Sequence, residues 1–193
     1  MPIVLNGSGT LTGISAGGLP DGCITAAELA TGVGGKILQI VQITKTDTTS
    51  TTSTTYGDIS GLSQAITTVA GSKVLCIGNV FYGTANAAYS TWFRLVRVDV
   101  DGSTNYPYLG DADGSTTRAS AGNYTGYYSY LADHSAFHFL DTPSGAGSHT
   151  YKIQWRQGYS GGYTSYLGRD KQGSTGETRG RVPSSLTLIE VSG

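Results

Sequence analysis

Hydrophobic and polar residues alternate most regularly over residues 149–156, His-Thr-Tyr-Lys-Ile-Gln-Trp-Arg. Successive side chains of a β-strand point to opposite faces, so the aromatic and aliphatic residues of this segment share one face and the Thr, Lys, Gln and Arg residues share the other. The pattern predicts a strand with one face in the core and one face in water.

Residues 73–81, Lys-Val-Leu-Cys-Ile-Gly-Asn-Val-Phe, form the clearest central strand. Apolar residues occupy both of its alternating faces, with Val74 and Val80 on one and Leu75 and Ile77 on the other. A single sandwich covers only one of these faces, so another copy of the chain or another layer would have to cover the second. The pattern therefore favours an oligomer.

Further apolar segments predict strands over residues 37–43, 91–98 and 136–141. Residues 37–43 are apolar on both faces, as expected for a strand that is covered on two sides. Residues 185–191, Ser-Leu-Thr-Leu-Ile-Glu-Val, predict a closing strand in the core. A terminus held in a sheet is a poor place for a tether, so we expect attachment to another structure through the opposite end.

Turns and loops separate these strands. Residues 58–62 predict a turn, followed by a short return strand over 64–67, and residues 142–147 predict another turn. The Thr/Ser-rich residues 44–55 either continue the first strand or form a loop. Two long segments rich in Gly and Tyr, within residues 103–133 and 158–180, predict loops.

The composition supports an all-β class. Only 13% of the 193 residues are charged, and 29 are Gly and 13 are Tyr. Gly disfavours helix and Tyr favours strands. With about seven to nine strands, residues 36–193 predict a jelly-roll-like β-sandwich head. The order resembles the trimeric heads of C1q and tumour necrosis factor, in which the last strand lies at the intersubunit core.

Residues 1–35 differ from the rest because glycines interrupt every apolar run. Thr25 and Glu28 have the spacing of a capping box and predict one short helix, which needs packing against a partner to be stable. The segment is either a disordered linker or a trimerising or virion-docking segment.

Residues 6–32, from Asn-Gly-Ser-Gly-Thr to Glu-Leu-Ala-Thr-Gly, resemble the opening segment of bacteriophage tail-fibre proteins, especially of phages that infect aquatic bacteria and cyanobacteria. Residues 36–42, the Thr/Ser tract and residues 72–75 resemble the β-rich region that follows. The resemblance implies a virion protein made in the host cytoplasm, usually a homotrimer. Its N-terminal part would join a phage tail or baseplate protein, and its C-terminal part would meet the host.

The charge and the apolar segments of the chain argue against nucleic acid and membranes as partners, and its cysteines argue against disulfides. The net charge of -1 gives no electrostatic case for binding nucleic acid or an anionic membrane. No segment approaches the roughly 20 apolar residues of a membrane span, and the first residues lack the pattern of a signal peptide. Cys23 and Cys76 are too few and too far apart for a disulfide framework, so we expect free thiols.

Motifs for catalysis or cofactor binding are absent from the sequence. His134 falls in a polar loop, and His138 and His149 fall on predicted strands, where they could be neighbours across a sheet. None of the three belongs to a group with metal-ligand spacing. Two Asp-x-Asp-Gly pairs, at Asp99/Asp101 and Asp111/Asp113, suit hairpin turns better than a calcium loop. We predict no enzyme, no cofactor and no metal, although a small glycan hydrolase remains an alternative.

The Tyr-rich loops are the remaining candidate site. A Tyr ring is flat and apolar with a polar tip, which suits stacking on sugars, and a neighbouring Arg suits an anionic group. Packing on the sheets is the alternative for each ring. The predicted receptor-binding residues are Tyr124, Tyr127, Tyr128, Tyr159, Tyr163, Tyr166 and Arg169.

These observations predict a phage tail-fibre protein that adsorbs to a glycan of the host bacterial surface, namely lipopolysaccharide. The alternative is a purely structural virion protein, in a baseplate or as a capsid decoration, without receptor binding.

Overall fold

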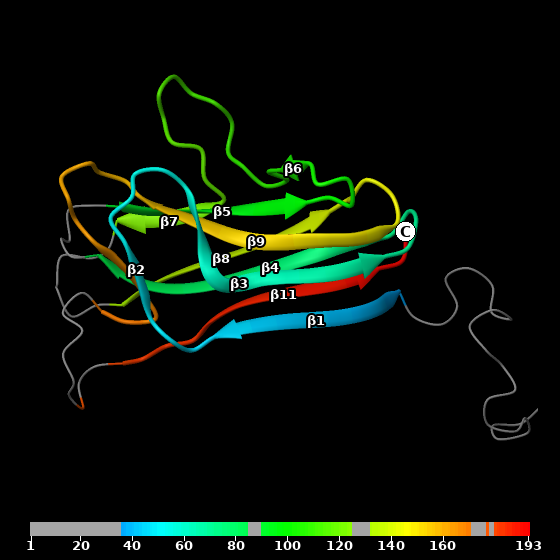
Figure 1. The fold of residues 1–193 in the computed structure, drawn as a ribbon, viewed down its shortest axis with the longest axis horizontal. Helices are drawn as coiled ribbons and strands as arrows, with labels where there is room; N and C mark the ends of the chain where they lie inside the picture. The colour runs from blue at the N-terminus through cyan, green and yellow to red at the C-terminus, as the bar shows by residue number, and fades with distance from the viewer. Residues whose placement is uncertain (1–35, 85–89, 125–131, 171–176, 178–179) are drawn as a thin grey trace, which may run out of the picture. The chain divides into compact units, whose positions relative to one another are not determined.

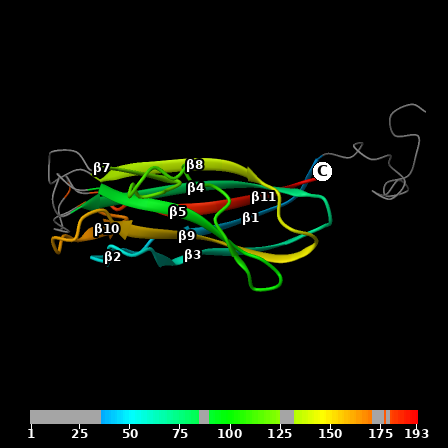
Figure 2. The same cartoon turned by 90° about the horizontal axis from the view of Figure 1, so that it is seen from above.

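The computed structural model describes residues 36–84, 90–124, 132–170, 177 and 180–193. Two antiparallel sheets pack face to face, and the axes of the long strands in the two sheets are nearly aligned (Figures 1 and 2). The predicted all-β sandwich is confirmed. The N-terminal segment with its predicted helix, Cys23, Tyr127 and Tyr128 lie outside the described residues, so the predictions about them stay predictions.

The first sheet has four long strands in the order β1-β11-β4-β8. Two short strands extend it, because β10 pairs with the C-terminal end of β4 and β2 pairs with β10. Its strands are β1 (Ile37–Lys45), β2 (Thr49–Thr51), β4 (Lys73–Thr84), β8 (Asp133–Asp141), β10 (Ser165–Leu167) and β11 (Ser184–Val191).

The second sheet has the order β3-β9-β5, and β5 carries two short strands on its free side. Its strands are β3 (Gly57–Thr68), β5 (Ser90–Val98), β6 (Thr104–Asn105), β7 (Ala121–Tyr124) and β9 (Gly147–Gln157).

The core lies between the sheets, and on β4, β9 and β11 most of it is built from every second residue. On β9 the buried hydrophobic residues are Tyr151, Ile153 and Trp155, and His149 and Gln157 are buried on the same face, as the alternation predicts. The Tyr82 ring of the first sheet meets the Phe93 ring of the second edge to face at a centroid distance of 4.9 Å. The cross-sheet contacts therefore follow directly from the period of two in the sequence.

The predicted closing strand, β11, lies between β1 and β4, with Leu186 and Leu188 fully buried. Glu190, the one charged residue in this run, is also buried. Its carboxylate accepts hydrogen bonds from the Val69 backbone N–H at 2.8 Å and the Ser72 hydroxyl at 2.6 Å. Burial opposes ionisation, but these hydrogen bonds outweigh it and lower the pKa of Glu190. Glu190 thus fastens the β3–β4 turn to the closing strand.

Two predictions about the strands are wrong, and a third is not tested by a single chain. Residues 57–68 form one strand, β3, because Gly61 takes a φ of +86° and lets the strand continue past a register shift between Asp58 and Ser63. Within the described residues β1 pairs only with β11 and exposes three apolar residues, so the predicted cover of its second face does not come from this fold and stays a prediction. His134, predicted in a loop, lies on β8.

Candidate functional surfaces

Four aliphatic residues cross the outer face of the first sheet in a straight row. Strand register pairs Ile40 with Ile189, Ile189 with Leu75, and Leu75 with Leu140, so one residue comes from each of four adjacent strands. Ile40 is 58% exposed and Leu140 is 48% exposed. We call these four residues the apolar row.

The surroundings of the apolar row carry little charge. The next cross-strand row consists of Gln42, Thr187, Ile77 and His138. Ile77 is itself exposed, and so is Leu38 near the start of β1. An exposed, contiguous apolar patch of this kind marks an interaction surface, because water solvates it poorly.

The outer face of the second sheet is polar instead. Arg94 on β5, Gln154 on β9 and Asp58 on β3 are cross-strand neighbours and form a chain of hydrogen bonds. Arg94 Nε donates to Gln154 Oε1 at 2.8 Å, and Gln154 Nε2 donates to Asp58 Oδ1 at 2.6 Å. Lys152 Nζ pairs with the other Asp58 oxygen at 2.8 Å. These bonds outweigh partial burial and lower the pKa of Asp58.

Two aromatic rings hold the Arg94 guanidinium. Its central carbon lies over the Tyr56 ring at 4.1 Å and over the Tyr106 ring at 4.3 Å, both from their centroids. Burial raises the pKa of Tyr56, an effect that the charge of Arg94 partly offsets. We call Tyr56, Asp58, Arg94, Tyr106 and Gln154 the Arg94 cluster. Sequence reasoning missed it, because only the sheet register brings these residues together.

Four of the predicted receptor-binding residues have described side chains, and they form two pairs. The Arg169 guanidinium lies 4.1 Å from the centroid of the Tyr166 ring, and the Tyr159 and Tyr163 rings are 6.1 Å apart. Tyr166 lies on strand β10 and not in a loop, which corrects the prediction. Tyr124 ends strand β7, and its side chain is outside the described part of the chain.

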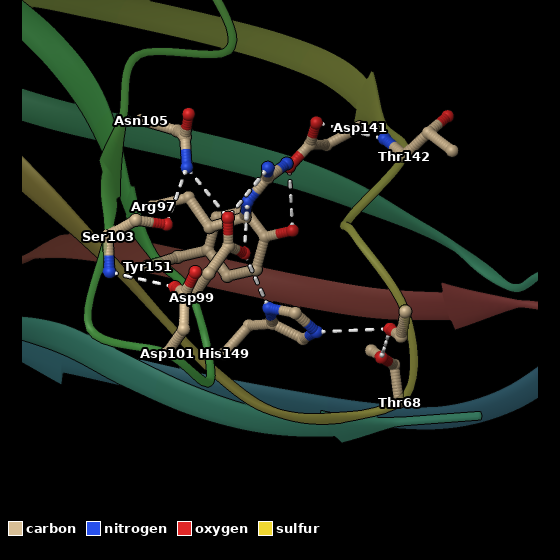
Figure 3. Close-up of polar contacts among 11 residues, drawn as sticks. Thr68, Arg97, Asp99, Asp101, Ser103, Asn105, Asp141, Thr142, His149 and Tyr151 are labelled. Carbon is tan, nitrogen blue, oxygen red and sulfur yellow. Dashed lines mark hydrogen bonds and ion pairs between the residues drawn. The ribbon is translucent and has the colours of Figure 1, made fainter. Parts of the chain in front are cut away.

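A buried polar network links the sheets at one end of the sandwich (Figure 3). Arg97 on β5 donates from Nε to Asp99 Oδ1 at 2.7 Å and from Nη1 to Asp141 Oδ2 at 2.6 Å. His149 Nδ1 lies 2.7 Å from the same Asp99 oxygen, and Tyr151 Oη donates to Asp141 at 2.8 Å. Every one of these side chains is buried.

The charged groups of this network stabilise one another and join the two sheets. Burial raises the pKa of Asp99, but hydrogen bonds from Arg97 and His149 outweigh it and the pKa is lowered overall. Burial and the neighbouring Asp141 carboxylate raise the pKa of Tyr151, which keeps its hydroxyl protonated as a donor. The charges are compensated inside the core.

The predicted turn role of Asp99 and Asp101 agrees with their contacts. The Gly102 N–H donates to the Asp99 backbone carbonyl, and Asp101 Oδ1 accepts from the Ser103 N–H at 2.9 Å. The Asp99 carboxylate is already occupied by Arg97, His149 and Asn105. Within the described residues, no group of three or more possible metal ligands occurs.

The histidines do not form a site together. His138 is exposed on the outer face of the first sheet, whereas His149 is fully buried and belongs to the second sheet. The possible pairing of these two across a sheet is therefore wrong. The described part of the chain also contains no helix that is long and apolar enough for a membrane span.

Comparisons with known proteins give distant structural likeness alone. No protein-family model and no curated protein matches the chain. Among solved structures, a chain in the structure of infectious bursal disease virus, Gx strain, is 13% identical with a TM-score of 0.44. The match covers 80% of this chain and 36% of that chain, so this chain spans little more than a third of the length of its match.

Proposed function

We propose that this chain is a structural protein of a virus particle, and that its β-sandwich assembles into a homotrimer through the apolar row. The observation that carries the proposal is the row itself: Ile40, Ile189, Leu75 and Leu140 point out of a sandwich whose core is already complete. Covering such a row removes apolar surface from water, which is the main driving force for association.

A second copy of the chain suits this face better than a charged partner. The apolar row contains no ionisable side chain, and the nearest ionisable residues on this face are His138 on β8 and Lys73, two residues before Leu75 on β4. A face with so little charge offers little complementarity to a highly charged partner, but its apolar row complements another apolar face of the same kind. Closed symmetry lets identical faces cover one another.

The strand order also supports this assembly. The order β1-β11-β4-β8 opposite β3-β9-β5-β7 is the order expected of an eight-strand jelly roll, which the C1q and tumour-necrosis-factor heads share. In such heads the last strand lies at the intersubunit core. Here the last strand, β11, contributes Ile189 to the apolar row.

The place in a virus particle rests on the sequence. The resemblance of residues 6–32 to the opening segment of phage tail fibres supports a virion protein that joins a tail or baseplate protein through residues 1–35. We propose a role without catalysis or a cofactor. The buried network around Arg97 and Asp99 supports it, because its charges compensate one another inside the core.

The oligomeric state of the purified chain, measured by sedimentation equilibrium, tests the assembly. We expect the wild type to be a trimer in solution and Ile40→Lys to be a monomer. Val100→Lys is the matched control, because Val100 is also 58% exposed but lies in the turn after β5. A monomeric wild type, or an Ile40→Lys variant that remains trimeric, contradicts the proposal.

Receptor binding is the second candidate function. The contact of Arg169 with Tyr166 and the 49% exposure of Tyr159 favour it, because they combine a cation with accessible aromatic rings. We expect the chain to bind host cells through lipopolysaccharide, and Tyr159→Ala and Arg169→Ala to weaken that binding. A purely structural protein would bind virus particles and ignore cells, so a cell-adsorption assay separates the two roles.

A further inference from the structure

We propose that the Arg94 cluster binds the carboxylate of an acidic sugar, such as a hexuronic acid, on the outer face of the second sheet. The cluster lies on the sheet opposite to the apolar row, so the site does not depend on the assembly proposed above. Its residues also differ from the predicted receptor-binding set.

The guanidinium of Arg94 is held before any ligand arrives. Its Nε donates to Gln154 at 2.8 Å, and Gln154 is held in turn by Asp58 at 2.6 Å. The rings of Tyr56 and Tyr106 lie within 4.3 Å of the guanidinium carbon. Because these contacts come from β3, β9, β5 and the segments beside them, the ordering cost of holding this side chain is already met on folding.

The terminal nitrogens of Arg94 remain available. Among the described residues, Nε is the only atom of this guanidinium with a hydrogen-bond acceptor, and no carboxylate forms an ion pair with Arg94. Arg97 shows the contrast, because two carboxylates compensate it. A planar guanidinium with two free terminal nitrogens matches the two oxygens of a carboxylate.

The local charge favours an anion although the whole chain has a net charge of -1. Among the residues of β3, β5 and β9 that point outward, Arg94, Lys152 and Arg156 lie on this face against a single carboxylate, Asp58. The Arg156 guanidinium carbon lies 5.9 Å from the centroid of the Tyr56 ring. The site therefore retains positive charge after Lys152 and Asp58 have paired.

The aromatic rings favour a sugar over a simple anion. Tyr106 is 43% exposed, so part of its ring is open to solvent beside the guanidinium. A flat ring offers an apolar surface to the C–H face of a sugar, and the Gln154 amide can exchange hydrogen bonds with hydroxyl groups. A peptide carboxylate would use Arg94 without needing this surface.

Isothermal titration calorimetry with trigalacturonic acid tests the site in the full-length protein. We expect binding that is at least tenfold weaker for the methyl ester of the same trisaccharide, which keeps the sugar rings and removes the charge. Arg94→Lys keeps the charge but loses the planar fork, and we expect at least tenfold weaker binding. Tyr106→Ala removes only the ring, and we expect a smaller loss.

Arg181→Gln is the matched control, because it removes an exposed Arg outside the cluster and leaves binding unchanged. The absence of binding, equal binding of the acid and its ester, or unchanged binding by Arg94→Lys each overturns the proposal. Triglutamate separates the two sources of a carboxylate. If it binds as tightly as the trisaccharide, the site does not select a sugar and the proposal fails.

Discussion

Arg97 on the second sheet donates a hydrogen bond to Asp141 on the first sheet over 2.6 Å, and both side chains are less than 10% exposed. The pair therefore joins the two sheets through the core and not around its rim. Removing one partner leaves a buried charge without compensation, whereas an ion pair on the surface can lose a partner to water at little cost.

We predict that Arg97→Met lowers the free energy of unfolding by about 3 to 5 kcal/mol. The variant leaves Asp99 and Asp141 buried without their cation. The control is Lys152→Met, which breaks the more exposed pair with Asp58 and should cost less than about 1 kcal/mol. Guanidinium denaturation measures both. Equal losses in the two variants would show that burial of the Arg97 pair is unimportant.

Acid should destabilise the fold through its buried carboxylates. The pKa values of Asp99 and Glu190 are lowered in the folded state, so their contribution is present above the unfolded pKa values near pH 4 and is lost as the pH falls through the folded values. We predict that the free energy of unfolding falls steeply below about pH 4. Urea denaturation between neutral pH and that range measures the slope.

Glu190→Gln should flatten that slope, because a neutral amide cannot take up the proton. Asp111→Asn is the control, since it removes an exposed loop carboxylate and should keep the slope of the wild type. A Glu190→Gln variant with the full wild-type slope would mean that other groups cause the acid transition.

Gly78 is required by the ring of Phe137, its cross-strand partner. A Cβ at Gly78 would lie 2.2 Å from the nearest carbon of that ring, so the ring would have to move within a packed core. We predict that Gly78→Ala lowers the free energy of unfolding by about 1 to 3 kcal/mol. Gly57→Ala is the control, because no atom lies within 4 Å of the added Cβ. Thermal denaturation compares them, and equal stability would argue against this packing.

The sequence predicts the strands well where burial alternates with a period of two. On β9, the buried Tyr151 and Ile153 flank the outward Lys152, as expected from the pattern alone. The prediction fails on β3. Gly61 and its neighbours have the residue types of a turn, but Gly61 lies at an irregularity within a continuous strand. Local sequence does not distinguish these two roles of glycine.

The candidate sites follow less directly from sequence because they depend on register. Tyr56 and Arg94 are far apart in the chain, and their contact exists only because Asp58 and Arg94 both pair with Gln154 on β9. The apolar residues on both faces of segments 37–43 and 73–81 did predict an apolar surface that one sandwich alone does not bury. The alignment of Ile40 with Leu140 across four strands requires the sheet order.

Assembly and sugar binding should be separable, because they use opposite sheets. We predict that Ile40→Lys leaves the affinity for trigalacturonic acid unchanged, since the Arg94 cluster is complete within one chain. For a long polygalacturonate that spans several sites, the same variant should bind at least tenfold more weakly, because linked sites gain about 100-fold or more in apparent affinity. Calorimetry with the trisaccharide and surface plasmon resonance with the polymer measure the two cases. If Ile40→Lys weakens the binding of the trisaccharide as much as that of the polymer, sugar binding at the Arg94 cluster depends on the apolar row.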